Sequence, residues 1–227
     1  MTTRLDPQVS VHLHFPQQEA PPHPGPGWTA LRLHIRHPLG SYGALPQLTR
    51  TIDWLTSLEH PVKIIVAGNH DLCLDENWAR PDYGFQPERA RATVRSLASA
   101  GLYYLEHESL HFTAPSGKVW KVYGSPAAPI HLEGAFQYAS STEAKAIYQR
   151  VPEDTEILIT HTPPYRTLDK TRKRKYVGCP TLSSRLRQLR HCRLHVFGTY
   201  PRSRGSRSRR RRRHTPRVSE CSSAAQR

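Results

Sequence analysis

Residues 62–67 form a short run, Val-Lys-Ile-Ile-Val-Ala, that is rich in β-branched side chains and closed by Gly68. Such a run is typical of a strand buried on both faces, as in a parallel sheet covered by helices. Over residues 45–58, before it, four leucines and an isoleucine recur at three- and four-residue steps. This spacing places one apolar stripe along a helix. The two patterns predict a helix that leads into a buried strand.

The same alternation continues along the chain. Further strands are predicted at residues 119–123, 157–160 and 194–197, and further helices at residues 88–100, 142–149 and 182–189. Gly101 follows the first of these helices, where a glycine C-cap is expected. Alternating strands and helices predict a layered α/β fold in which loops at the strand ends hold the functional groups.

The predicted fold occupies the middle of the 227-residue chain. Residues 1–40 are rich in proline and histidine without a sustained hydrophobic period, so we expect them to be poorly ordered. Residues 199–227 hold ten arginines and one glutamate, so this tail supplies +9 of the net charge of +15. A tail of this composition is expected to be disordered. Residues 41–198 are therefore predicted to form the one folded domain.

The loop Gly68-Asn69-His70-Asp71 directly follows the predicted strand at residues 62–67. An Asn carbonyl is a neutral oxygen ligand, a His can bind a metal or act as an acid, and an Asp can orient that His through its ring N–H. Glycine allows a sharp turn beneath them. The alternative is a polar turn in which His70 and Asp71 satisfy local backbone groups.

A second loop has the same placement, because His161 directly follows the predicted strand at residues 157–160. Pro163 and Pro164 cannot continue a strand ladder, so they would hold His161 at the strand end, where its imidazole could face a metal ion. The alternative is a hydrogen-bonded loop histidine without a ligand.

Together the two loops resemble the calcineurin-like metallophosphoesterase family, in its small fungal and animal branch of phosphodiesterase-like members. The resemblance runs from about residue 40 to residue 198. It rests on an ordered series of segments at residues 51–55, 62–74, 123–126, 158–164, 178–180 and 194–198. Such a series is more specific than either loop alone.

The resemblance implies a metallophosphoesterase-type β-sandwich flanked by helices, with two divalent metal ions held at the strand ends. In such sites the ions lie ~3.5–4 Å apart, generate a hydroxide and stabilise the phosphoryl oxygens. Asn69 and His161 would be ligands of the second metal, His70 the acid that protonates the leaving oxygen, and Asp71 the residue that orients His70. Oxygen and imidazole ligands suit manganese, iron or zinc. The substrate would be a phosphomonoester or a phosphodiester.

The family pattern breaks at both ends of the resemblance. No Asp-x-His precedes residue 62, no Gly-Asp dipeptide occurs in the chain, and Gly198-Thr199-Tyr200-Pro201 stands where the family has Gly-His-x-His. The first strands and the C-terminal strands of the fold are therefore expected to be missing. We interpret the coincidence of motif loss with composition change as a misread frame or exon boundary. Histidines 12, 14, 34 and 37 are interpreted as solvated loop residues and not as replacement ligands.

Three functions stay open at this point: a hydrolase, a degenerate fold without catalysis, and a nucleic-acid binder that uses the arginines between Arg202 and Arg217. A second basic run at residues 172–175 is interpreted as a solvated loop, although the long loop from Tyr165 to Tyr176 could shape specificity. The absence of a secretory signal and of a long apolar run predicts an intracellular protein, cytoplasmic or nuclear, without membrane association.

Overall fold

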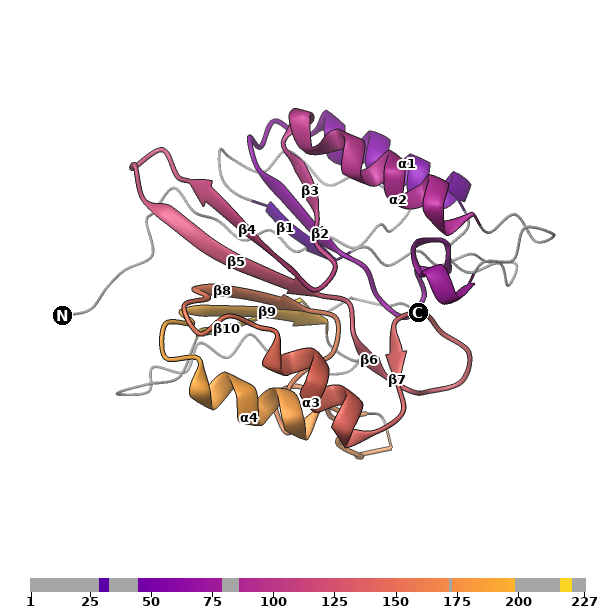
Figure 1. The fold of residues 1–227 in the computed structure, drawn as a ribbon, viewed down its shortest axis with the longest axis vertical. Helices are drawn as coiled ribbons and strands as arrows, with labels where there is room; N and C mark the ends of the chain where they lie inside the picture. Colours follow the sequence, from indigo (N-terminus) through magenta and orange to yellow (C-terminus); the bar gives the residue numbers. More distant parts are fainter. Residues whose placement is uncertain (1–28, 33–44, 79–85, 172, 199–216, 222–227) are drawn as a thin grey trace.

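The computed structural model describes residues 29–32, 45–78, 86–171, 173–198 and 217–221, the first and last of these ranges as backbone only. These residues form a sandwich of two β-sheets with a pair of helices on each outer face (Figure 1). Among the described helices, none is both long and apolar enough to cross a membrane.

The first sheet has three parallel strands in the order β1-β2-β3. They span Thr29–Arg32 (β1), Lys63–Val66 (β2) and Leu102–Tyr104 (β3). Helices α1 (Leu45–Ser57) and α2 (Pro87–Arg95) cover the outer face of this sheet (Figure 1). Short 3-10 helices lie at Leu72–Leu74 (η1), Glu76–Trp78 (η2) and Ser96–Ala100 (η4).

The second sheet has five strands in the order β10-β9-β8-β5-β4, of which only the β4–β5 pair is antiparallel. They span Glu108–Thr113 (β4), Val119–Ser125 (β5), Ile157–Thr160 (β8), Leu194–Gly198 (β9) and Arg217–Cys221 (β10). Helices α3 (Ser141–Gln149) and α4 (Pro180–Gln188) cover its outer face (Figure 1). A small pair, β6 (Ala128–Pro129) and β7 (Gln137–Tyr138), lies beyond the sheet.

Three apolar clusters fill the spaces between the four layers. Along β2, Ile65 belongs to the cluster under α1 and α2, whereas Ile64 and Val66 belong to the cluster between the sheets. Along β8, Ile159 lies between the sheets and Leu158 lies under α3 and α4. Both faces of each strand are thus buried, which explains why residues 64–66 and 157–159 are continuous apolar runs without polar alternation.

The elements predicted from hydrophobic pattern agree closely with the structure. The strands predicted at residues 157–160 and 194–197 correspond to β8 and β9, and the helix predicted over residues 45–58 is α1. The helix predicted at residues 88–100 is confirmed in type, but its second half is the 3-10 helix η4. Gly101 ends it in the left-handed conformation, with φ of 75°, as a C-cap requires. Strands β3 and β4 were not predicted.

Two strands lie where the sequence predicts poor order. Strand β1 falls within residues 1–40 and β10 within residues 199–227, so residues 29–32 and 217–221 form strands that the sequence pattern does not predict. Each pairs in parallel with a buried strand, β1 with β2 and β10 with β9, so tertiary pairing supplies an order that local pattern does not show. The rest of both segments, including histidines 12, 14, 34 and 37 and the arginines up to position 213, lies outside the described residues.

Candidate active site

The loops after β2 and β8 meet, although they belong to different sheets. The backbone N–H of Asn69 donates to Nε2 of His161 at 3.4 Å. A Cβ atom at Gly68 would lie 2.2 Å from Nδ1 of the same ring, far inside van der Waals contact. Glycine at position 68 is therefore what allows the imidazole of His161 to lie against the Asn69 backbone.

Asp71 stabilises the loop after β2 through hydrogen bonds to Gly68. Its carboxylate is buried, and its Oδ2 atom accepts the backbone N–H of Gly68 at 2.5 Å. The backbone N–H of Asp71 in turn donates to the Gly68 carbonyl at 3.0 Å. These two bonds close a tight turn that places the side chains of Asn69 and His70 at the surface, where both are partly exposed. The role of Asp71 in orienting His70 stays a prediction.

A third loop, between β6 and β7, packs against the Asn69 turn. The carbonyl of Asn69 accepts the backbone N–H of Ala135 at 2.9 Å, and Nε1 of Trp78 donates to the carbonyl of Gly134 at 2.9 Å. Asp75 completes the contact, because its Oδ2 atom accepts the backbone N–H of Phe136 at 2.5 Å. The segment after the Asn69 turn and the β6–β7 loop therefore form one connected wall beside the candidate site.

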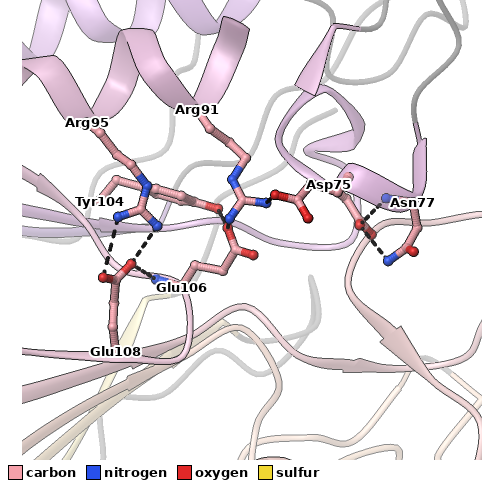
Figure 2. Close-up of polar contacts among 8 residues, drawn as sticks. Asp75, Asn77, Arg91, Arg95, Tyr104, Glu106 and Glu108 are labelled. Carbon is pink, nitrogen blue, oxygen red and sulfur yellow. Dashed lines mark hydrogen bonds and ion pairs between the residues drawn. The ribbon is translucent and has the colours of Figure 1, made fainter. Parts of the chain in front are cut away.

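An ion-pair network holds that wall against helix α2. Arg91 pairs with Glu76 at 2.5 Å and with Glu106 at 3.3 Å, and Arg95 pairs with Glu108 at 2.8 Å (Figure 2). Burial raises the pKa of the Glu106 carboxyl, an effect that its hydrogen bond and ion pairs only partly offset. Since Glu76 belongs to η2 and Glu106 follows β3, Arg91 ties both segments to the same helix.

Behind His161, a buried histidine fixes the turn that carries it. Oγ1 of Thr160 donates to the carbonyl of Thr162 at 2.7 Å and lies 2.9 Å from Nε2 of His195. The hydroxyl has a single proton, which the first bond uses, so Nε2 of His195 must carry the proton of the second bond. His195 therefore acts through Thr160 as a positioning residue for the His161 turn, a role that no pattern in the sequence indicates.

His107 is a second residue that sequence analysis missed. Its Nδ1 atom lies 3.2 Å from Oγ of Ser125, and the carbonyl of Ser125 accepts the backbone N–H of His161 at 3.0 Å. His107 adopts a left-handed backbone conformation, with φ of 55°, which is unusual for a non-glycine residue. This conformation, and not a motif, is what marks His107, so no pattern in the sequence could have found it.

Both of these histidines are held in the neutral form. Burial lowers the pKa of His195 from 6.5 to about 3, and burial together with the charge of Arg150 lowers the pKa of His107 to about 4. In the unfolded chain both rings would protonate near pH 6.5. Their contribution to stability is therefore fully present above pH 6.5 and is lost as the pH falls from there through the folded-state pKa values.

We expect the free energy of unfolding to fall between pH 6.5 and pH 5, before most carboxylates titrate. Each histidine contributes a slope of up to about 1.4 kcal/mol per pH unit. Urea denaturation at four pH values in this window measures the slope. His195→Gln removes one contribution, so its slope should be shallower than that of the wild-type chain. Equal slopes would show that His195 is not buried in its neutral form.

The donor set fits a metal site only in part. Asn69 and His161 supply an amide oxygen and an imidazole, which suit divalent transition metals. Within the described ranges, however, no three side chains of His, Cys, Asp or Glu converge as a potential metal-binding group. The structure therefore brings the backbone of Asn69 against the ring of His161, and the assignment of these two residues as metal ligands stays a prediction.

A sandwich of two sheets covered by helices, with Asn69 and His161 in loops at the ends of parallel strands, agrees with the metallophosphoesterase-type fold that the resemblance implies. Comparison with protein families agrees: the family described as calcineurin-like phosphoesterase matches residues 40–198. The chain belongs to this family. The match covers the same segment that the sequence resemblance indicated.

Several curated proteins are similar to the chain. Metallophosphoesterase domain-containing protein 1 of Homo sapiens is 30% identical over 157 residues, which are 64% of this chain and 46% of that protein. UPF0046 protein K07C11.7 of Caenorhabditis elegans is 28% identical over 162 residues, 69% of this chain and 51% of that protein. Probable rhamnogalacturonate lyase C of Emericella nidulans is 36% identical over 157 residues, 69% of this chain but 14% of that protein. The chain thus spans about half or less of the length of these relatives.

Proposed function

We propose that the chain is a metal-dependent phosphoesterase whose active site lies where the loops after β2 and β8 meet. The observation that carries the proposal is the contact between the Asn69 backbone and the His161 ring, across a glycine that leaves no room for a side chain. It brings two family motifs from different sheets to one place. Membership of the calcineurin-like phosphoesterase family supports phosphate esters as the substrate class.

Each predicted site residue has a role in this proposal. Asn69 and His161 would hold a divalent cation, with manganese, iron and zinc all compatible with their donor atoms. Bound metal ions in such sites lower the pKa of water and stabilise charge on the phosphoryl oxygens. His70, which is partly exposed, would give a proton to the leaving oxygen. Asp71 would hold the turn that presents both Asn69 and His70.

A second candidate function is phosphoester binding without turnover. The observation that favours it is the lack of a three-ligand group within the part of the chain that the structure describes. Without a bridging carboxylate, two dications close together would repel each other without compensation. A chain of this kind would bind metal weakly and would hydrolyse nothing.

Hydrolysis of bis(p-nitrophenyl) phosphate by the purified full-length chain separates the two functions. We expect turnover in the presence of manganese and its loss on addition of a chelator, with recovery when manganese is restored. Calorimetric titration with manganese on the same sample gives the number of sites and their affinity. Micromolar binding with turnover supports the enzyme, whereas neither binding nor turnover would leave the degenerate fold as the answer.

A further inference from the structure

Within the loop between His161 and helix α4, the described residues form a hairpin. It leaves the candidate site after Pro164 and returns at Cys179, and these two residues form a parallel bridge at its base. Further along, Lys170 and Tyr176 form an antiparallel bridge. We call residues 165–171 and 173–176 the tyrosine hairpin. It includes residues 173–175 of the basic run that was interpreted above as a solvated loop, and it lies in the loop that was expected to shape specificity.

A buried carboxylate fixes the base of the tyrosine hairpin. Oδ2 of Asp169 accepts the backbone N–H groups of Arg166 and Gly178, both at 2.9 Å. The side chain of Asp169 is fully buried. Above it, the backbone N–H of Thr171 donates to the carbonyl of Lys175 at 2.8 Å. The hairpin is therefore held in one shape before any ligand arrives, which reduces the entropy cost of binding.

Two tyrosine rings stand exposed on this hairpin. Tyr165 and Tyr176 retain 37% and 44% of their accessible surface, and their ring centroids lie 5.9 Å apart with an interplanar angle of 69°. The guanidinium carbon of Arg166 lies 5.4 Å from the Tyr165 centroid and 5.5 Å from the Tyr176 centroid. Nζ of Lys170 lies 5.5 Å from the Tyr176 ring. Cations and aromatic faces are thus interleaved over a small surface.

The hairpin also carries a concentrated positive charge. Its exposed cations are Arg166, Lys170, Lys173, Arg174 and Lys175. No Asp or Glu among the described residues forms an ion pair with any of them. The single carboxylate of the hairpin, Asp169, is buried and accepts backbone N–H groups. This charge is therefore available to an anionic partner.

We propose that the tyrosine hairpin binds single-stranded nucleic acid. Its cations would contact successive phosphates, and the rings of Tyr165 and Tyr176 would stack on unpaired bases, the combination by which proteins hold single strands without strong sequence preference. An anionic lipid surface fits less well as the partner. The apolar side chains that could enter a membrane, Leu168 in the hairpin and Val177 next to it, are partly buried, and the exposed rings of the hairpin carry polar hydroxyls. The proposal does not depend on hydrolysis at the His161 site.

Binding is tested by fluorescence anisotropy of a labelled twelve-nucleotide oligothymidylate (about the length that one such module covers). The protein is the full-length chain with the arginines at positions 209–213 replaced by serine, so that the charge of the tail does not hide that of the hairpin. We expect the double variant Tyr165→Ala/Tyr176→Ala to raise Kd at least about tenfold. Tyr165→Phe/Tyr176→Phe keeps both rings and should bind as the parent does.

A charge variant tests the phosphate contacts separately. The double variant Lys173→Gln/Lys175→Gln should make the plot of log association constant against log salt concentration less steep, by roughly 0.7 for each cation removed. The matched control, Lys145→Gln/Arg190→Gln, removes the same charge from two exposed positions outside the hairpin and should leave the slope unchanged. Equal reductions in both variants would show non-specific attraction to the whole surface and would overturn the proposal.

A polyphosphate chain of twelve phosphates distinguishes stacking from charge alone. The tyrosine-to-alanine pair should leave polyphosphate binding nearly unchanged while it weakens oligothymidylate binding. If both probes lose the same affinity, the tyrosines do not stack on bases and the proposal fails. It also fails if phosphatidylserine vesicles, and not the oligonucleotide, require the two rings.

Discussion

Replacing His161 by Ala is expected to lower kcat/KM for bis(p-nitrophenyl) phosphate by about 10³-fold, the upper end of the loss caused by removing one preorganised group that stabilises transition-state charge. The ring lies at the meeting point of the two loops, with Nε2 at 3.4 Å from the Asn69 backbone nitrogen. The turn that carries it is fixed by Thr160 and Ser125 in a buried layer. The loss should therefore fall on catalysis and metal affinity, with the folded structure retained.

His131→Ala provides the matched control, because His131 is exposed on the β6–β7 loop. It should leave both kcat/KM and the calorimetric manganese titration unchanged. Thermal denaturation of the two variants separates a lost ligand from a lost fold. Equal rates in His161→Ala and the wild-type chain would mean that any hydrolysis measured does not arise at this site, and the proposed active site would have to be abandoned.

Gly68→Ala is expected to lower both stability and activity through a single added methyl group. Its Cβ atom would lie 2.2 Å from Nδ1 and 2.4 Å from Cε1 of His161, so the ring or the turn must move. Overpacking of this kind costs about 1–3 kcal/mol in the free energy of unfolding. A displacement of the imidazole by about 1 Å would reduce kcat by about 10²-fold. Urea denaturation and the phosphodiester assay measure the two effects.

Gly117→Ala separates this steric effect from the general cost of replacing a glycine. Gly117 has φ of 81°, but a Cβ atom there would meet nothing within 4 Å. The substitution should therefore cost about 1 kcal/mol through backbone strain and leave kcat unchanged. NMR signals of the His161 ring should shift in Gly68→Ala alone. Unmoved signals in that variant would show that the ring does not lie against position 68.

The pattern of the sequence predicts the buried elements best, for a physical reason. Strand β8 is buried on both faces, so its run of apolar residues is continuous and its boundaries at residues 157–160 are clear. Strand β4 is an edge strand with mixed burial, so its residues, Glu-Ser-Leu-His-Phe-Thr, show no decisive period. Strands β1 and β10 depend on pairing with β2 and β9, which no local pattern can express.

The candidate site likewise contains residues that the sequence pattern indicates and residues that it does not. Asn69, His70, Asp71 and His161 follow predicted strands closely, so strand-end placement marks them as candidates. His195 supports the site from the middle of a strand, through a hydroxyl that lies in a neighbouring strand. Such support depends on register between segments far apart in the sequence, and register is set by the assembled sheet. The sequence pattern therefore indicates candidate site residues and leaves out the residues that support the loops carrying them.

The two halves of the site belong to different sheets, and this separation links ligand binding to the mechanics of the fold. Asn69 extends from the three-stranded sheet and His161 from the five-stranded sheet, while Val66 and Ile159 fill the apolar layer between them. A ligand held by both loops would act as a clamp across that layer. Since a ligand bound only to the native form stabilises it, saturation should raise the free energy needed to separate the sheets as well as occupy the site. Substitutions deep in the layer would then change affinity at the surface without touching the ligand.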